Sequence, residues 1–417
     1  MERVRYPDVF KITFEFHDII DAIERRLNRQ HAARKTVQGV ARATLIGVYQ
    51  DRHEVDWRQA EMVELASTAG VQIEHRVIQH RSKPDPKFVV GKGKLEEVVL
   101  ECLDEDIDLL IFDNDLTPAQ ARALASSTDL KIIDRTQLIL DIFAQHASSR
   151  DGKLQVELAQ LRYNLPRLTE MDAGLSRLTG GIGGRGPGET KLEINRRRAR
   201  ERITKLENQI KSLSKQRSLR RKNRYHSGLP VAAVVGYTNA GKSTLLNRLT
   251  RSDVLVADQL FATLDPTSRR LSYPNGHHLI LTDTVGFIRD LPPDLVAAFR
   301  ATLEELEGAE VLIHVVDISD PRRDDKINAV RTILDELQLN RIQEVLVLNK
   351  SDTLEPFEYR ALARKLNAHA VSATTGQGLE ELREVLLNRT TKADAAEWDH
   401  SDSEAEAHQE RGVLPPI

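Results

Sequence analysis

Eight consecutive residues contain glycines and a lysine at the spacing that binds nucleotide phosphates. An apolar run, Val231–Val235, precedes them, and leucines at helical spacing follow, which is the context that this motif requires. The glycines let backbone N–H groups surround phosphate oxygens. We expect Lys242 to contact the β- and γ-phosphates and Ser243 to bind Mg²⁺. The motif, with the threonine that follows it, comprises Gly236, Tyr237, Thr238, Asn239, Ala240, Gly241, Lys242, Ser243 and Thr244.

Three further motifs follow in the order expected of a guanine-nucleotide site, each at the end of an apolar run. In the first, Asp283 can hold Mg²⁺ through water and the Gly286 N–H can sense the γ-phosphate. In the second, the Asp352 carboxylate can accept hydrogen bonds from two N–H groups that guanine has and adenine lacks. Binding adenine in place of guanine would therefore cost about 2–4 kcal/mol of binding free energy. Four motifs in this order predict GTP as the ligand. The three later ones are Asp283, Thr284, Val285, Gly286; Asn349, Lys350, Ser351, Asp352; and Ser372, Ala373, Thr374.

Strand-like and helix-like segments alternate on both sides of a helical stretch. This alternation predicts an α/β fold, in which a P-loop domain with a mostly parallel sheet follows a smaller α/β domain. Pro118, after Thr117, is expected to begin a helix. The strands expected are 43–49, 71–78, 107–112, 130–133, 231–235, 279–282, 311–317, 344–348 and 370–371.

Leucines and isoleucines in the helical stretch recur at spacings of three and four. Leu154, Leu158, Leu161, Leu165 and Leu168 form one such seam, and Ile203, Leu206, Ile210 and Leu213 form another. The pattern predicts two antiparallel helices, with Pro166 kinking or ending the first. Six of the eleven residues of Gly180–Thr190 are glycine, so we expect an exposed loop at the tip of this hairpin.

The second helix of the predicted hairpin is strongly basic. Lys191–Arg224 contains fourteen Lys and Arg but three acids, a net charge of +11 in a chain whose total is −3. A solvated helix face usually has balanced charge, so this imbalance favours contact with phosphates of structured RNA. The predicted RNA contacts are Arg185, Arg196, Arg197, Arg198, Arg220, Arg221 and Lys222.

Composition limits the remaining possibilities. The 417 residues suffice for two or three domains, and 29% are charged, with a mean hydropathy of −0.41. Cys102 is the only cysteine, which excludes an intramolecular disulfide and a Cys-rich zinc site. We find no transmembrane run or signal peptide and expect a cytoplasmic monomer, with partial peripheral association with membranes left open.

These motifs resemble the HflX family of ribosome-associated GTPases over roughly residues 44–389. The most specific marks are Gly180–Thr190 and the segment Phe261, Ala262, Thr263, Leu264, Asp265, Pro266, Thr267. The resemblance implies that Phe261–Asp265 contact GTP and that Thr263 closes on Mg²⁺ together with Ser243 and Asp283. Lys242, Thr263 and Gly286 would then be the catalytic residues.

Family resemblance also implies a partner and a second cation. The partner is the large ribosomal subunit with its rRNA, whose separation from the small subunit the protein would promote before hydrolysing GTP to GDP. Phe287 stands where Ras-like enzymes have a glutamine that positions water. An asparagine at the position of Asn239 helps hold K⁺ in related GTPases. The long family form has a further folded domain that we do not expect after Arg389.

We therefore expect five regions and leave two alternative functions open. The regions are a loosely ordered extension (1–35), an α/β domain (36–147), a helical hairpin (148–228), a GTPase domain (229–390) and a disordered acidic tail (391–417). One alternative is a non-catalytic GTP switch that binds RNA or ribosomes. The other is an RNA-remodelling ATPase acting through the N-terminal domain, where Gly91–Lys94 could bind an anion.

Overall fold

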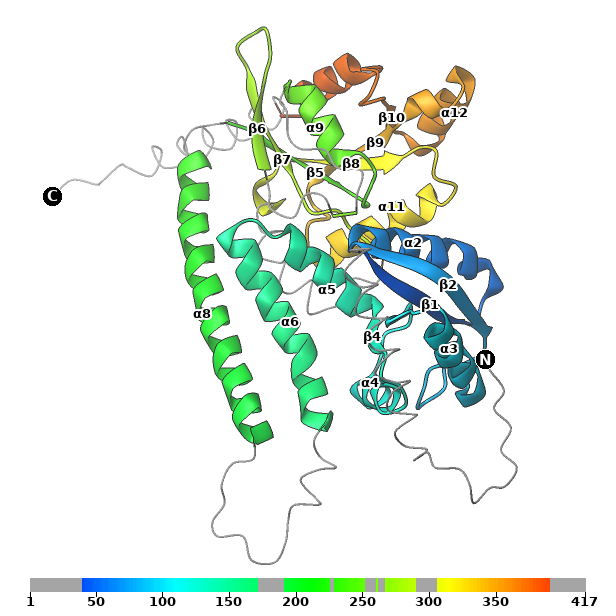
Figure 1. The fold of residues 1–417 in the computed structure, drawn as a ribbon. Coiled ribbons are helices and arrows are strands. Elements are labelled where there is room, and N and C mark those ends of the chain that lie inside the picture. The colour runs from blue at the N-terminus through cyan, green and yellow to red at the C-terminus, as the bar shows by residue number, and fades with distance from the viewer. Residues whose placement is uncertain are drawn as a thin grey trace, which may run out of the picture. The chain divides into compact units, whose positions relative to one another are not determined.

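The computed structural model describes residues 40–171, 191–225, 229–251, 260–261, 267–289 and 306–390 (Figure 1). These fall into two compact units, one of residues 40–114 with 123–133 and one of residues 115–122 with 134–390. The five-region division predicted from the sequence remains a prediction. So do the expectations for residues 1–35, the Gly180–Thr190 loop and the tail after 390, which lie outside the described residues. Thr263 and Arg185 also lie outside them.

Strands and helices alternate in the N-terminal part, as predicted. Its sheet has the order β2-β1-β3-β4, and β1 pairs in parallel with both β2 and β3. The strand predicted from Ile107 begins only at Leu109. Pro118 begins a helix, and the Thr117 hydroxyl accepts from the Gln120 N–H at 3.2 Å. The elements are β1 (Ala41–Tyr49), η2 (Arg52–Glu54), α2 (Val55–Thr68), β2 (Val71–His80), α3 (Lys92–Asp104), β3 (Leu109–Phe112), α4 (Pro118–Ala125), β4 (Lys131–Asp134) and α5 (Arg135–His146).

The two predicted helices of the hairpin are α6 (Arg150–Met171) and α8 (Lys191–Tyr225). They run side by side in opposite directions (Figure 1), and their seam buries Leu158 and Leu206. Arg162 pairs with Glu207 and Arg202 with Glu157, both at 2.7 Å. The seam confirms the hairpin predicted from the leucine spacing.

Pro166 does not end α6, which continues to Met171. A proline within a helix leaves the carbonyl four residues earlier without its usual N–H donor. The helix is supported beyond it by Arg167, which donates to the Tyr163 carbonyl at 2.9 Å and stacks on the Tyr163 ring. Arg167 also pairs with the buried Asp134 at 3.0 Å. Tertiary contacts therefore outweigh the local cost of the proline.

The second sheet has six strands in the order β10-β9-β8-β5-β7-β6. Its strands pair in parallel except for β6, which runs antiparallel to β7 and was not predicted. The elements are β5 (Val231–Gly236), α9 (Lys242–Thr250), β6 (Thr267–Ser272), β7 (His278–Asp283), η3 (Leu306–Gly308), β8 (Val311–Asp317), α11 (Arg323–Glu336), β9 (Gln343–Asn349), η4 (Ser351–Thr353), α12 (Pro356–Leu366), β10 (His369–Ala370) and a helix over 379–390.

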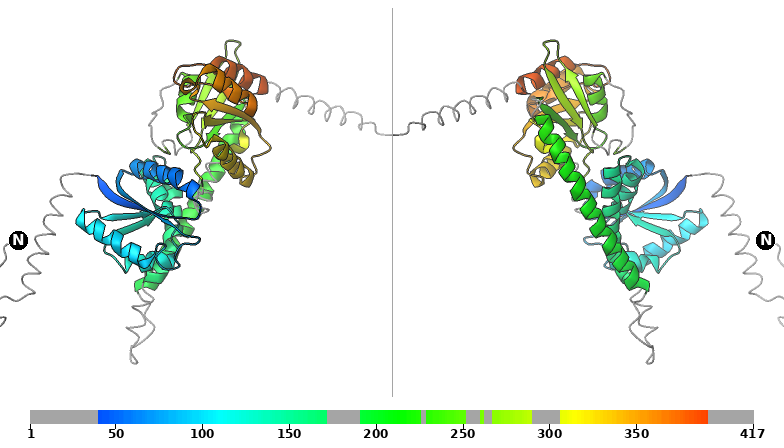
Figure 2. Two further views of the ribbon diagram at one scale, coloured as in Figure 1. Left: turned by 90° about the vertical axis from the view of Figure 1, so that its right-hand side faces the viewer. Right: turned by 90° about the vertical axis from the view of Figure 1, so that its left-hand side faces the viewer.

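Helices cover both faces of this sheet (Figure 2). On one face, α9 and the helix 379–390 contribute Leu246 and Leu382 to a core with Val234 and Val315. On the other face, α11 and α12 contribute Ile327 and Tyr359. Covering both faces explains why β5 and β8 read as continuous apolar runs. Among the described residues, we find no helix with the length and apolar character needed to cross a membrane.

Candidate guanine-nucleotide site

The P-loop between β5 and α9 has a backbone that only glycine fits at two positions. Gly236 has φ +150°, and a Cβ there would lie 2.2 Å from the Val315 carbonyl oxygen. Gly241 has φ +85°, and a Cβ there would lie 2.3 Å from Asn349 Nδ2. Both conformations are costly for other residues. These positions explain why the motif requires glycine at both ends.

Lys242, at the start of α9, is buried inside the loop that precedes it. Its Nζ donates to the Tyr237 carbonyl at 2.9 Å. Burial lowers the pKa of this amine to about 8, although the nearby Asp283 carboxylate opposes the shift. A buried ammonium at the mouth of a loop of backbone N–H groups can form short, charge-assisted hydrogen bonds to phosphate oxygens.

Ser243 and Asp283 meet at the base of the P-loop. The Ser243 hydroxyl donates to Asp283 Oδ2 at 2.7 Å, and the Thr284 N–H donates to Asp283 Oδ1 at 3.0 Å. Asp283 is fully buried at the end of β7. One hydroxyl and one carboxylate, both hard oxygen donors, suit Mg²⁺, which usually keeps several waters and takes few protein ligands. Within the described part of the chain, no three His, Cys, Asp or Glu side chains cluster as a metal site.

The residues after Asp283 are joined to the P-loop by backbone hydrogen bonds. The Phe287 N–H donates to the Gly236 carbonyl at 3.0 Å, and the Thr238 N–H donates to the Phe287 carbonyl at 2.8 Å. Phe287 itself is buried, 2% exposed. A Cβ at Gly286 would lie 2.9 Å from Lys242 Nζ. The segment Asp283–Gly286 therefore packs directly against the end of the lysine side chain.

Sequence reasoning did not anticipate the role of the Tyr237 side chain. Its hydroxyl accepts from the Arg289 N–H at 2.9 Å, and Lys326 of α11 lies 4.6 Å from the centre of its ring. The hydroxyl thus fixes the chain two residues beyond Phe287 against the P-loop. The sequence feature that could have indicated this contact is a tyrosine at one of the variable positions of the P-loop motif.

The predicted guanine end of the site is organised by Asn349. Its Nδ2 donates to the Ala240 carbonyl at 2.9 Å, and its Oδ1 accepts from the Ala373 N–H at 3.0 Å. One buried amide therefore joins the P-loop, the end of β9 and the Ser372–Thr374 loop. Nearby, the Ser351 N–H donates to the Val371 carbonyl at 3.0 Å. The Asp352 side chain remains exposed.

A second contact missed by sequence reasoning positions Lys350. Its backbone is left-handed, with φ +62°, and its Nζ lies 2.7 Å from Asp317 Oδ2 at the end of β8. The other oxygen of Asp317 accepts from the Ser319 N–H at 3.0 Å and from the Ser319 hydroxyl at 2.6 Å. The carboxylate therefore fixes the lysine on the same edge of the sheet as Asp352.

Phe261, for which a nucleotide contact remains a prediction, has its side chain buried against α5. Its ring centre lies 4.6 Å from that of Phe143, and its carbonyl lies 3.0 Å from His146 Nδ1. Arg135, at the other end of α5, donates to the Arg289 carbonyl at 3.0 Å. Ala262, Thr263, Leu264 and Asp265 lie outside the described residues.

The predicted basic face of α8 is present, with one difference. Arg197 and Arg198 are exposed, whereas Arg196 is half-buried. The three arginines occupy successive positions, which are 100° apart around the helix axis, so they do not share one face of α8. The side chains of Arg220, Arg221 and Lys222 lie outside the described part of the structure.

Comparison with known proteins places this chain in a defined group. Profiles described as GTP-binding GTPase N-terminal, GTP-binding GTPase Middle Region and 50S ribosome-binding GTPase match residues 57–144, 146–224 and 231–350. A solved GTP-binding protein from Sulfolobus solfataricus in complex with GDP has 25% identity, over 85% of this chain and 100% of that one, with a TM-score of 0.46.

Curated relatives extend over most of the chain. GTPase HflX of Escherichia coli K12 is 46% identical over 83% of this chain and 82% of its own length. That of Caldanaerobacter subterraneus is 51% identical over 71% of this chain and 69% of its own. That of Akkermansia muciniphila is 40% identical over 91% and 92%. With the four motifs converging on one sheet edge, these matches show that the chain belongs to the HflX family of GTPases.

Proposed function

We propose that this GTPase binds the large ribosomal subunit in its GTP form, promotes separation of stalled or idle ribosomes, and hydrolyses GTP for release. The observation that carries the proposal is the pair of hydrogen bonds made by the Asn349 side chain. These two bonds link three of the four predicted GTP-binding loops. The match to a 50S ribosome-binding GTPase profile supports the choice of partner. So does the net charge of +11 over Lys191–Arg224.

The catalytic roles that we propose follow from the positions of the groups. Lys242 and the P-loop N–H groups would stabilise charge on the γ-phosphate, and the Gly286 N–H would detect it. Ser243 and Asp283, whose oxygens meet at 2.7 Å, would hold Mg²⁺ together with Thr263. Bound Mg²⁺ would neutralise charge on the β- and γ-phosphate oxygens. Phe287 contributes no group that could orient water, so hydrolysis without a ribosome should be slow.

Sedimentation with ribosomal subunits tests the proposal. The full chain is expected to co-migrate with the large subunit most strongly in a non-hydrolysable GTP analogue, less in GTP and least in GDP. Equal co-migration in all three nucleotides would contradict a GTP-dependent cycle. Phosphate release measured with and without ribosomes then separates hydrolysis from the alternative of a non-catalytic switch, in which ribosomes would not increase the rate.

The ATPase alternative is tested by competition. Unlabelled ATP in tenfold excess is expected to leave labelled GTP bound, because Asp352 has no pair of N–H donors to accept from on adenine. In the N-terminal part, the Gly91 N–H already donates to the Gln79 side chain at 3.0 Å. Displacement of GTP by ATP, or ATP hydrolysis that survives Lys242→Met, would favour the alternative.

Nucleotide affinity is expected to fall at alkaline pH. Lys242 has a pKa of about 8 in the structure, and phosphate binding favours its charged form. Above pH 8 the free protein loses this proton, so binding must take one up, and affinity should drop about tenfold between pH 7 and pH 9. Calorimetry in buffers of different ionisation enthalpy measures this uptake. Lys242→Met is the control, since it retains only the pH dependence of the nucleotide itself.

Potassium is proposed as a second cation near Asn239. This residue has a left-handed backbone, with φ +60°, at the P-loop position where related GTPases use asparagine to hold K⁺. Turnover is expected to be several-fold faster in K⁺ than in Na⁺ at equal ionic strength, and Asn239→Ala should remove the difference. Equal rates of the unmodified protein in both salts would exclude a role for K⁺.

Cytoplasmic location and a monomeric state remain part of the proposal.

A further inference from the structure

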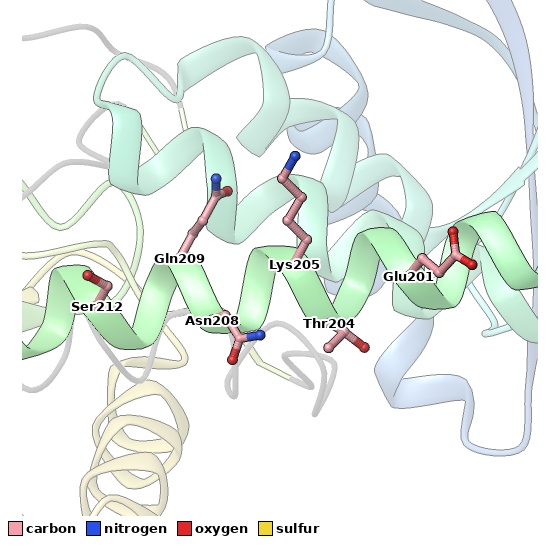
Figure 3. A pocket seen from close by; sticks show the side chains of 6 residues that line it. All are labelled: Glu201, Thr204, Lys205, Asn208, Gln209 and Ser212. Atoms are coloured by element: carbon pink, nitrogen blue, oxygen red, sulfur yellow. The ribbon is translucent and has the colours of Figure 1, made fainter.

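The outward face of α8 carries uncharged hydrogen-bonding side chains along its middle. Figure 3 shows this stretch, where a groove of about 630 Å³ is lined, in the described residues, by Glu201, Thr204, Lys205, Asn208, Gln209 and Ser212. Thr204, Asn208 and Ser212 are exposed and recur every four residues, so they lie in one row along the helix. Their hydroxyl and amide groups both donate and accept hydrogen bonds.

Cationic side chains flank this row at both ends. Arg197 and Arg200 precede it, Lys211 and Lys215 lie at its far end, and all four are exposed. From Arg197 to Lys215 the helix rises about 27 Å at 1.5 Å per residue. Between Arg197 and Lys215, the described acid on this face is Glu201, which lies 4.0 Å from Arg197, so its charge is offset by that arginine.

The row faces away from α6. At 100° per residue, the buried Leu206 is 200° around the helix axis from Thr204. The ion pairs that join α8 to α6 involve Arg202 and Glu207, which also lie off the row. Lys191–Arg224 contains no aromatic residue. This stretch therefore offers no ring on which the bases of a single strand could stack.

We propose that this row binds the minor groove of an RNA double helix. The minor groove of A-form RNA is wide and shallow, with phosphates along its edges and 2′-hydroxyls exposed within it. The cations at the two ends of the row would meet phosphates of the two strands, while Thr204, Asn208 and Ser212 bind 2′-hydroxyls between them. The inference rests on the proposed function and specifies which form of rRNA α8 contacts.

Fluorescence anisotropy of the full chain in a non-hydrolysable GTP analogue tests this with three probes: a 20-base-pair RNA duplex, a DNA duplex of the same sequence and a single RNA strand. The RNA duplex is expected to bind about tenfold more tightly than either of the others. Thr204→Val/Asn208→Leu/Ser212→Ala should abolish the preference for RNA over DNA without changing the salt dependence, because no charge is lost. Asn328→Leu/Thr332→Val, two exposed residues of α11, is the matched control and should change nothing.

Removing the flanking charges should change the salt dependence of binding and leave the preference for RNA over DNA intact. Arg197→Gln/Lys215→Gln is expected to weaken both duplexes and to reduce the salt slope by about 1.8, or 0.9 per phosphate contact. Equal binding of RNA and DNA by the unmodified protein, tighter binding of the single strand, or equally effective competition by polyglutamate would each overturn the inference. If co-sedimentation with the large subunit persists in those cases, the inference alone fails. Loss of co-sedimentation as well would also contradict the proposed function.

Discussion

Asp352→Asn is expected to lower GTP affinity by about 30- to 1,000-fold, corresponding to 2–4 kcal/mol for losing a charge-assisted pair of hydrogen bonds. Xanthine has a carbonyl where guanine has its exocyclic amine, so the asparagine amide can donate to it. The variant should therefore bind xanthosine nucleotides more tightly than guanosine nucleotides. Titration with fluorescent GDP and XDP measures both affinities. Because Asp352 is exposed in a short 3-10 turn, we expect no loss of folding stability.

A matched variant separates this effect from a general loss of negative charge. Glu380→Gln removes a carboxylate that is 84% exposed in the same unit, beyond the Ser372–Thr374 loop. It should leave both affinities unchanged. If Asp352→Asn keeps the original preference for guanine over xanthine, Asp352 does not read the base. The assignment of GTP would then rest on the family alone.

Arg197→Glu/Arg198→Glu is expected to weaken binding to the large subunit by at least 100-fold at physiological salt. Both side chains are exposed on α8, and the two substitutions change its charge by −4. Each lost phosphate contact lowers the salt slope of the binding constant by about 0.7–0.9, so the slope should fall by about 1.4–1.8. Co-sedimentation over a range of KCl concentrations measures both quantities. Arg196 is left unchanged because it is half-buried.

The control for this prediction is an equal charge change elsewhere. Arg364→Glu/Lys365→Glu reverses two exposed charges in the last turn of α12. It should leave the affinity for the subunit within about threefold of the original value. An equal loss in both variants would mean that net charge, and not the face of α8, governs association.

The nucleotide motifs were predictable because their requirements are local. Gly236 and Gly241 need a backbone that other residues adopt only with strain, and Lys242 begins a helix at a fixed distance from them. The apolar runs before each motif likewise predicted the parallel strands. A short pattern suffices when the residues that must cooperate are neighbours in the chain.

The contacts that sequence reasoning missed join residues that are far apart in the chain. Tyr237 meets Arg289 across 52 positions, and Asp317 meets Lys350 across two neighbouring strands. Nothing in the local pattern of either pair indicates the other. The continuation of α6 through Pro166 has the same origin, because Arg167 reaches Asp134 outside the helix. Local sequence propensity predicts the structure of each segment considered alone, whereas contacts with distant residues determine the structure that the segment adopts.

Helix α5 connects two segments near the proposed nucleotide site to the helical hairpin. At one end of α5, Arg135 donates to the carbonyl of Arg289, three residues after Gly286, for which we propose a contact with the γ-phosphate. At the other end, Phe143 and His146 contact Phe261, two residues before Thr263. The helix ends at His146 and α6 begins at Arg150, so only a short linker joins the two helices. If the GTP and GDP forms place Arg289 or Phe261 differently, α5 would shift with them and carry α6, which packs against the basic helix α8.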